Sequence, residues 1–247
     1  MPTVGSRQSV EAGKAEARVS EAEDPTLSLL AARALEHVRD GMAVGLGSGR
    51  AATAFIRALA TRVTAGLRIQ CVPTSEATAR LARELGLPLV ELEGAALDVT
   101  VDGADEVDPR LNLIKGYGGA LVRERIVAAA SRRLIILVGA EKLVPILGTR
   151  GRLPIEVVPF ALPLCRRRLE ALGYRPELRR DGERPFVSDN GNLILDCGTG
   201  ALGDPAAAER AIRAIPGVVD TGLFLGTAHT VLVAEGGTVR ELTRKET

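Results

Sequence analysis

The chain has 247 residues, 46% of them hydrophobic, and a formal net charge of +1 at pH 7. This length accommodates one large domain or two modest ones, and the near-neutral charge without a basic stripe argues against nucleic acid and anionic membranes as partners. Aromatic residues make up only 2% and Trp is absent, which argues against base-stacking platforms, and no apolar stretch has transmembrane length.

The first residues, 1–24, are predicted to be a disordered extension. They are rich in Ala, Glu, Ser and Arg, lack the hydrophobic region of a signal peptide, and carry acids that argue against a transit peptide. Leu27 to Val38 place Leu and Ala at helical spacing, which predicts a helix with Thr26 as its N-cap. His37 lies on this helix and is interpreted as a surface or boundary residue without a chemical role.

A strand, a glycine loop and a helix come next, in a pattern typical of phosphate binding. The strand is Met42–Leu46, the loop is Gly47–Ala52, and the helix continues to about Thr61. Glycines let backbone N–H groups approach an anion, the helix dipole favours negative charge there, and Ser48 can add a hydroxyl donor. The loop also fits the dinucleotide fingerprint GxGxxA, but the next strand, Leu67–Val72, lacks the acid that NAD binding expects at its tip. A monophosphate is therefore preferred, with a purely structural turn as the alternative.

Alternating elements continue to about residue 138. A helix is expected from Ser75 to Leu85 with Gly86 as its C-cap, then a short strand at Pro88–Leu92 and another at Arg133–Val138. This alternation predicts a parallel sheet with helices on both faces.

Charged residues concentrate between Asp98 and Ser131. The strand 99–101 ends in Asp102-Gly103-Ala104-Asp105, the apolar run 111–114 ends in Lys115, and a glycine-rich turn then starts a helix that carries Glu124. Ligands bind outside the carboxyl ends of strands in open α/β sheets, so these side chains are expected around a ligand. Asp and Gly also form ordinary turns, which is the structural alternative for each residue taken alone.

The second part of the chain has a different order of elements. Strands are expected at 155–158, 174–179, 192–196 and 218–225, and helices at 162–172 and 205–215. The order β-α-β-β-α-β is that of a ferredoxin-like fold, and Asn190-Gly191 is a strong turn signal. A last apolar strand, Thr230–Ala234, is expected to return to the first sheet.

Cysteines and histidines form no metal-binding pattern. Cys71, Cys165 and Cys197 are scattered and odd in number, which indicates reduced thiols in the cytoplasm. His37 and His229 form no HxxxH pair, so neither a zinc nor a non-haem iron site is expected.

Seven segments form long motifs spread from residue 45 to residue 226: GLGSGRAA, VDGADEVD, LIKGYGGALVRERIVA, LVGAEKLV, LPIEVVPFA, VSDNGNLILDC and IPGVVDTGLFLG. Together they closely resemble the A-type ribose-5-phosphate isomerases, over nearly the whole chain from Leu27 onward. The resemblance implies an α/β fold with a Rossmann-like parallel-sheet domain, residues 25–150 plus 226–247, and a smaller ferredoxin-like α+β domain, residues 151–225.

The resemblance also implies a reaction, the interconversion of ribose 5-phosphate and ribulose 5-phosphate through an enediolate, with neither metal nor organic cofactor. The expected partner is a small pentose phosphate, with no nucleic acid and no membrane, and the expected assembly is a cytoplasmic homodimer or dimer of dimers. Glu124 is the implied general base, and Asp102 and Lys115 are the other implied catalytic residues.

The implied substrate-binding positions lie in three segments and at one later lysine: Ser48, Gly49, Arg50, Ala51, Asp102, Gly103, Ala104, Asp105, Lys115, Gly116, Tyr117, Gly118 and Lys142. Arg50 and Ala51 replace the Ser and Thr of the commonest loop, GTGSTA, so a hydroxyl is lost at Ala51. Arg50 either supplies a charged donor instead or points to solvent. Tyr117 replaces a glycine, and Glu141 replaces a serine.

The residue types fit this chemistry. A carboxylate such as Glu124 can remove the proton beside a carbonyl, and Lys115 can stabilise the enediolate oxygen. Asp102 can shuttle a proton between sugar oxygens and assist ring opening, while Asp105 binds a hydroxyl.

Two alternatives remain. A sugar-phosphate sensor has a related α/β domain, but it needs an output module, and residues 1–24 are too polar to fold as one. An amino-sugar phosphate deaminase would need a histidine near the acids, and neither histidine is so placed in the sequence.

Overall fold

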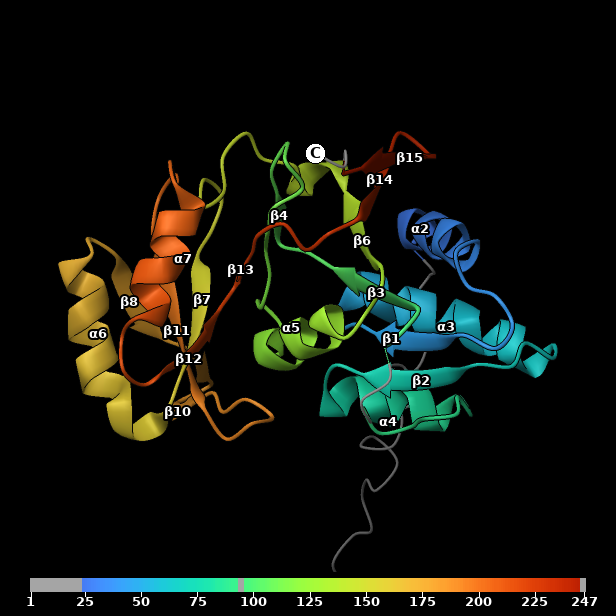
Figure 1. Cartoon of the computed structure of the whole chain (residues 1–247), viewed down its shortest axis with the longest axis horizontal. Helices are drawn as coiled ribbons and strands as arrows, with labels where there is room; N and C mark the ends of the chain where they lie inside the picture. Colours follow the sequence, from blue (N-terminus) through green and yellow to red (C-terminus); the bar gives the residue numbers. More distant parts are fainter. Residues whose placement is uncertain (1–23, 93–95, 245–247) are drawn as a thin grey trace, which may run out of the picture.

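The computed structural model of the protein describes residues 24–92 and 96–244, so the predicted extension lies outside the described residues except for Asp24. Two main sheets, one of six strands and one of four, lie side by side, and a three-stranded sheet connects them (Figure 1). Within the described residues, no helix is long and apolar enough to cross a bilayer.

The six-stranded sheet confirms the predicted α/β fold. In spatial order its strands are β15 (Thr238–Thr243), β14 (Thr230–Glu235), β6 (Leu134–Gly139), β3 (Val99–Gly103), β1 (Ala43–Leu46) and β2 (Gln70–Pro73). The strands from β14 to β2 are parallel, and the strand expected at 230–234 joins β6 as predicted. The sequence reading missed β15, which pairs antiparallel with β14 at the edge.

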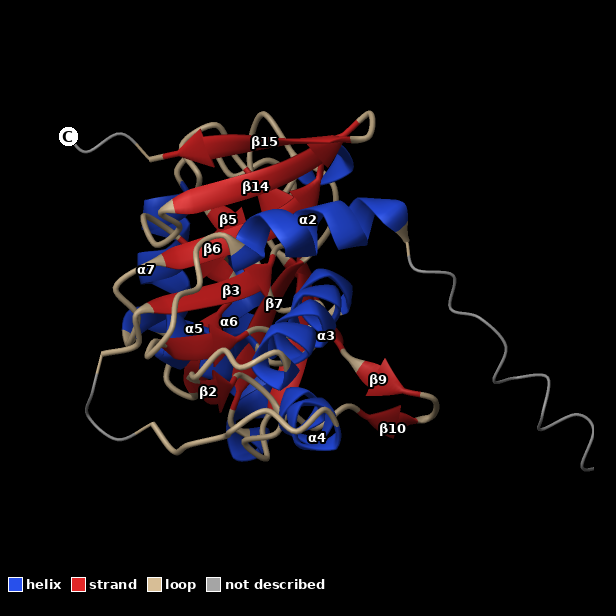
Figure 2. Ribbon diagram, turned by 90° about the vertical axis from the view of Figure 1, so that its right-hand side faces the viewer, coloured by secondary structure: helices blue, strands red, loops and turns tan. Residues whose placement is uncertain are grey.

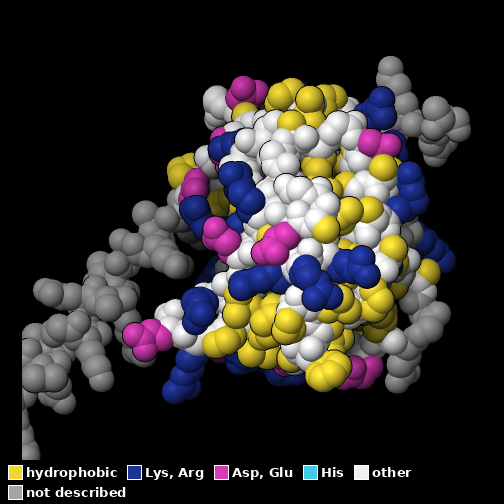
Figure 3. All heavy atoms as spheres, turned by 90° about the vertical axis from the view of Figure 1, so that its left-hand side faces the viewer, with side chains coloured by type: hydrophobic (Ala, Val, Ile, Leu, Met, Phe, Trp, Pro, Cys, Tyr) yellow, Lys and Arg dark blue, Asp and Glu magenta, His cyan; other side chains and the backbone are white. Residues whose placement is uncertain are grey.

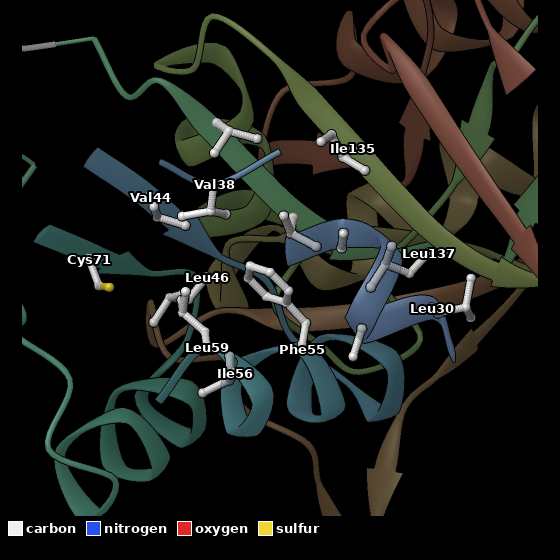
Figure 4. Close-up of a cluster of buried hydrophobic side chains, with 14 of the residues drawn as sticks. Leu30, Val38, Val44, Leu46, Phe55, Ile56, Leu59, Cys71, Ile135 and Leu137 are labelled. Carbon is white, nitrogen blue, oxygen red and sulfur yellow. The ribbon is translucent and has the colours of Figure 1, made fainter. Parts of the chain in front are cut away.

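Helices cover both faces of this sheet. They are α2 (Pro25–Leu35), α3 (Arg50–Thr64), α4 (Glu76–Glu84) and α5 (Leu121–Ala129). Helices α2 and α3 pack together on one face (Figure 2), and α5 lies on the other. Figure 4 shows the core on the α2–α3 side, where Leu30 and Phe55 meet Ile135 and Leu137. The intervening residues Ile136 and Val138 point into a second cluster on the opposite face, as strand alternation requires.

Helix α2 begins earlier than expected. Asp24, not Thr26, is its N-cap: the Asp24 carboxylate accepts from the Thr26 N–H at 3.0 Å, and Pro25 occupies the first turn. The regular helix ends at Leu35, but a tighter turn follows, in which the Val38 N–H donates to the Leu35 carbonyl. This turn keeps Val38 buried, which explains why the apolar spacing extended to that residue.

The four-stranded sheet has the ferredoxin-like order β12-β7-β11-β8 and is antiparallel throughout. Its elements are β7 (Leu153–Val157), α6 (Leu162–Ala171), β8 (Arg175–Leu178), β11 (Leu193–Gly198), α7 (Pro205–Arg213) and β12 (Val218–Thr221). A hairpin of β9 (Arg180–Asp181) and β10 (Arg184–Pro185) precedes β11, and single 3₁₀ turns lie at Ala140–Lys142 and Pro159–Ala161. Helices α6 and α7 lie on its outer side (Figure 1).

The three-stranded sheet corrects two predictions. It consists of β13 (Leu223–Phe224), β5 (Leu113–Ile114) and β4 (Glu106–Val107), all antiparallel. The run at 111–114 is therefore not a strand of the parallel sheet, and Leu111 has a left-handed φ of 58°. The strand expected at 218–225 is split at Gly222, where a Cβ would lie 2.3 Å from the Lys115 carbonyl oxygen.

The prediction of a strand at Pro88–Leu92 is also wrong. Among these residues only Leu89 makes a β-bridge, to Cys71 of β2.

Candidate active site

A cavity of about 450 Å³ opens where β1, β3 and β6 end. Its walls include every predicted site residue except Asp102. The parallel sheet brings Ser48 and Asp105 to this edge after the neighbouring strands β1 and β3, the three-stranded sheet supplies Lys115, and α5 supplies Glu124. The expectation that a ligand site lies at the carboxyl edge of the sheet therefore has a geometric counterpart.

Lys115 is the centre of the buried charges. Its Nζ lies 2.9 Å from Asp102 Oδ2 and 3.2 Å from Glu124 Oε2, and donates to the Gly103 carbonyl at 2.6 Å. Burial by itself lowers the pKa of the Lys115 ammonium, but the two carboxylates outweigh burial and hold that pKa above its ordinary value. The lysine therefore carries a fixed positive charge in a water-poor wall of the cavity.

Asp102 supports this lysine from behind the cavity wall. It is 1% exposed, and its Oδ1 accepts from the Ser48 N–H at 3.1 Å and the Gly103 N–H at 2.7 Å. Gly47 leaves the room for this contact, since a Cβ at that position would lie 2.3 Å from Asp102 Oδ1. One carboxylate thus ties the glycine loop to the lysine.

Glu124 lies in the first turn of α5 and is 4% exposed. Among the described residues, the polar partner of its Oε2 is the Lys115 ammonium, with Nζ 3.2 Å away. Burial raises the pKa of the Glu124 carboxyl, and the positive charge of Lys115 opposes that rise. A buried carboxylate on a cavity wall with a raised pKa has the character of a general base.

The glycine turn after Lys115 is held from both sides. The Tyr117 N–H donates to Asp105 Oδ2 at 3.0 Å, and burial raises the pKa of the Asp105 carboxyl. From the four-stranded sheet, Arg179 donates to the Gly116 and Tyr117 carbonyls, both at 3.0 Å, while it pairs with Asp196. Sequence reasoning missed Arg179 and Asp196, because they lie some sixty residues or more beyond the turn they support.

The glycine loop differs from the expectation in where Ser48 points. Its hydroxyl contacts those of Thr74, Ser75 and Thr78, at 2.9, 2.9 and 3.2 Å. These three residues were missed, although Thr74 and Ser75 stand at the strand tip where the acid of an NAD site was looked for. Gly49, with a φ of 92°, is the N-cap of α3, so the first N–H groups of that helix face the cavity edge.

Three further predicted residues, Arg50, Ala51 and Lys142, line the same cavity. Arg50 is 84% exposed in its side chain and pairs with Asp24 at 3.3 Å, and Ala51 follows it on α3. Lys142 is half-buried in the turn after β6. Neither His37 nor His229 lines the cavity, which removes the histidine that a deaminase would need there. No group of three or more potential metal ligands occurs in the described part of the chain.

Comparison with known proteins decides the family. The family model for ribose 5-phosphate isomerase A (phosphoriboisomerase A) matches residues 70–237. A ribose-5-phosphate isomerase A of Roseiflexus sp. (strain RS-1) is 53% identical over 216 residues, covering 86% of this chain and 93% of the relative. The corresponding protein of Gloeobacter violaceus is 52% identical, covering 86% and 94%.

The chain belongs to the ribose 5-phosphate isomerase A family. The predictions of the family and of its reaction, the isomerisation of ribose 5-phosphate to ribulose 5-phosphate in the pentose phosphate pathway, are confirmed.

Solved structures agree with this membership. The isomerase of Methanocaldococcus jannaschii superposes with a TM-score of 0.85 at 38% identity, covering 90% of this chain and 99% of that one. A D-ribose-5-phosphate isomerase in complex with phospho-erythronic acid gives 0.86 at 38% identity, covering 89% and 98%.

Tyr117, where the commonest isomerase A motif has a glycine, turns its ring away from the turn that carries it. Its hydroxyl accepts from the Arg152 N–H at 2.9 Å, and the Arg152 guanidinium lies 5.3 Å from the ring centroid. The ring joins the core of the four-stranded sheet. In this isomerase the residue therefore fastens the glycine turn to that sheet.

The raised pKa of Glu124 predicts the pH profile of the isomerase. A base acts when deprotonated, so with Glu124 as the base kcat/KM should rise with pH through the pKa of Glu124 in the free enzyme, above the ordinary value of 4.5. Lys115 should impose no loss up to neutral and mildly alkaline pH, because its pKa is raised. Initial rates of ketose formation from about pH 4 to about pH 9 measure this profile. A flat profile down to about pH 4 would contradict it.

Proposed function

We propose that Glu124 is the general base of this isomerase and Lys115 its electrostatic catalyst. In the open-chain sugar, Glu124 takes the proton from C2 and returns it to C1. The C1 carbonyl oxygen carries the negative charge of the intermediate enediolate, and the Lys115 ammonium stabilises that charge. A single observation supports the proposal: Glu124 Oε2 and Lys115 Nζ lie 3.2 Å apart in the wall of one cavity.

The two aspartates take supporting parts in this proposal. Asp102 keeps Lys115 protonated and aimed. Because Asp102 does not line the cavity, the proton that moves between the sugar oxygens during ring opening and enediolate formation passes through the Lys115 ammonium, which contacts both Asp102 and the cavity. Asp105 faces the cavity and binds a sugar hydroxyl, together with the backbone of Gly103, Ala104 and the turn at 116–118.

The phosphate is held at the other end of the cavity. The N-terminus of α3, with Ser48, Gly49 and Ala51 in its approach, supplies backbone N–H groups and the positive end of a helix dipole. Lys142 and Arg50 supply positive charge on either side. Ala51 takes part only through its backbone.

Arg50 places an exposed positive charge where the commonest loop has a serine hydroxyl, and its contribution to phosphate binding can be measured separately. Arg50→Ala should raise KM for ribose 5-phosphate about fivefold with little change in kcat, since an exposed cation contributes to binding of the ground and transition states alike. Arg57→Ala is the matched control, an exposed arginine on the same helix that does not line the cavity. Equal KM values for the Arg50 variant and the parent would remove Arg50 from the phosphate site.

Turnover of ribose 5-phosphate by the purified chain tests the function, with ketose formation followed in the presence of a chelator. Full activity under chelation supports a reaction without metal, and loss of activity that a divalent cation restores contradicts it. Binding of the sugar phosphate without any turnover would instead favour the sensor.

We extend the proposal to the organisation of the enzyme. Residues 25–150 with 226–247 form the catalytic domain, and residues 151–225 form the smaller domain.

The proposed compartment is the cytoplasm, and no nucleic acid takes part. Reduced, buried cysteines support that compartment. Burial raises the pKa of the Cys71 and Cys197 thiols to about 12, which leaves these thiols unreactive.

A homodimer or dimer of dimers is proposed as the assembly. Hydrophobic side chains gather on the face that the smaller sheet and its helices present (Figure 3). Phe160 is 96% exposed, and Val158 beside it is 42% exposed. Sedimentation equilibrium of the purified chain distinguishes these assemblies from a monomer.

A further inference from the structure

Two arginines flank Glu124 on α5, and they fasten that helix to different parts of the molecule. Arg123 donates to Asn190 Oδ1 at 3.1 Å and to the Asp189 carbonyl at 3.0 Å, and pairs with Glu76 at 2.9 Å. These partners lie on the outside of the molecule, in the loop before β11 and at the start of α4.

Arg125 reaches the segment between β12 and β13. One of its terminal nitrogens donates to the Thr221 and Leu223 carbonyls, both at 2.7 Å, and its Nε donates to Asp220. Asp220 is 5% exposed and is further fixed by the Thr221 N–H at 2.8 Å. The guanidinium therefore grips two backbone carbonyls and one buried carboxylate of the same short stretch.

That stretch also holds Lys115. The Gly222 carbonyl, between the two that Arg125 grips, accepts from the Lys115 N–H at 2.9 Å. The next residue, Leu223, pairs with Ile114 directly before the lysine. Residues 221–223 thus connect the helix of Glu124 with the backbone of Lys115.

Phe224 adds a side-chain connection. Its ring is fully buried, with the Arg125 guanidinium carbon 4.2 Å and Lys115 Nζ 5.6 Å from its centroid. Both cations are therefore packed against one rigid aromatic ring.

We propose that Arg125 is a positioning residue, which fixes the separation of Glu124 and Lys115 by tying α5 to residues 220–224. This inference rests on the proposed roles of those two residues. Arg125 does not line the cavity, so it acts through the geometry of the pair and not by contact with the sugar. A displacement of about 1 Å in such a pair can cost about 10²-fold in rate.

Three variants test the proposal in the full-length enzyme. Arg125→Met should lower kcat about 10²-fold and leave KM within about threefold, because the phosphate-binding groups lie on other elements. Arg125→Lys keeps a cation that reaches one carbonyl and should recover about tenfold of that loss. Arg123→Met, on the other side of Glu124, should keep kcat within about threefold of the parent.

The remaining outcomes separate the explanations. Arg125→Met leaves the buried Asp220 carboxylate with only the more distant Arg213, at 3.8 Å, as a counter-ion. The double variant Arg125→Met with Asp220→Asn removes this poorly compensated charge, and so restores folding without restoring the tie. Circular dichroism of that double variant confirms a folded chain, and its kcat should stay low. Parent-like kcat in the folded double variant, or equal losses in the Arg123 and Arg125 variants, overturns the proposal.

Glu124→Gln separates this proposal from the proposed function. If Glu124→Gln keeps full turnover, the proposed base is wrong. If Glu124→Gln loses turnover while Arg125→Met does not, only the positioning role of Arg125 fails.

Discussion

Replacing Glu124 by Gln should lower kcat by about 10²- to 10⁴-fold, the range that a positioned base contributes. Gln keeps the shape of the side chain and its place in the first turn of α5, but it cannot take a proton. KM should change little, because the proposed phosphate-binding groups lie on other elements of the cavity wall. Ketose formation measures kcat, and transfer of solvent deuterium to the sugar measures proton abstraction directly.

The matched control is Glu141→Gln. Glu141 is another acid that lines the cavity, but it is exposed and folds back over Gly139. Its substitution should keep kcat within about threefold, since no reacting atom depends on it. If the Glu124 variant turned over at the parent's rate, the base would have to be a different group.

Replacing Lys115 by Met should affect both rate and stability. Loss of the ammonium removes the charge proposed to stabilise the enediolate, which should cost about 10²- to 10³-fold in kcat. It also leaves Asp102 and Glu124 without their buried counter-ion, and breaking such a pair typically costs about 3–5 kcal/mol. Denaturant unfolding should show a lower free energy of unfolding than the parent's.

The pH dependence of that stability identifies its origin. In the folded parent, the pKa of Lys115 is raised above its value of 10.5 in the unfolded chain. The contribution of Lys115 to the free energy of unfolding is therefore complete below pH 10.5, and it is lost only as pH rises through the pKa of the folded state. In the variant, Glu124 has lost the cation that opposes the rise of its pKa, so stability should fall as pH rises and this carboxyl ionises. Lys115→Met with Glu124→Gln removes this charge and should regain stability while staying inactive. Equal stabilities of the single variant and the parent would contradict the buried pair.

The sequence predicted the layers of the fold because each layer has its own periodicity. The runs at 43–46, 99–103 and 134–139 are short, apolar and followed by helices, which is enough to predict a parallel sheet. Periodicity does not report the pairing partner, so residues 111–114 could not be placed in an antiparallel three-stranded sheet. The break at Gly222 depends on the Lys115 carbonyl, over a hundred residues away in sequence.

The same limit applies to the site. Residues that line the cavity lie in compact sequence motifs, so the resemblance to the isomerase family predicted them together. Residues that support them from a distance, such as Arg179 under the glycine turn and Arg125 beside Phe224, have no local pattern. The sequence shows that Arg50 and Tyr117 differ from the commonest residues of the family motifs. Only the structure shows that Tyr117 contacts Arg152 and that Arg50 pairs with Asp24.

The hold of residues 222–224 on Lys115 has a consequence for how the enzyme matures during translation. The glycine loop, the acids, the lysine and the base all leave the ribosome well before Gly222 and Phe224 do. Until residues 222–224 have paired with β5, Lys115 lacks both the Gly222 carbonyl that fixes its backbone and the Phe224 ring near its ammonium. The contacts that fix Lys115 can therefore form only after these residues have been synthesised.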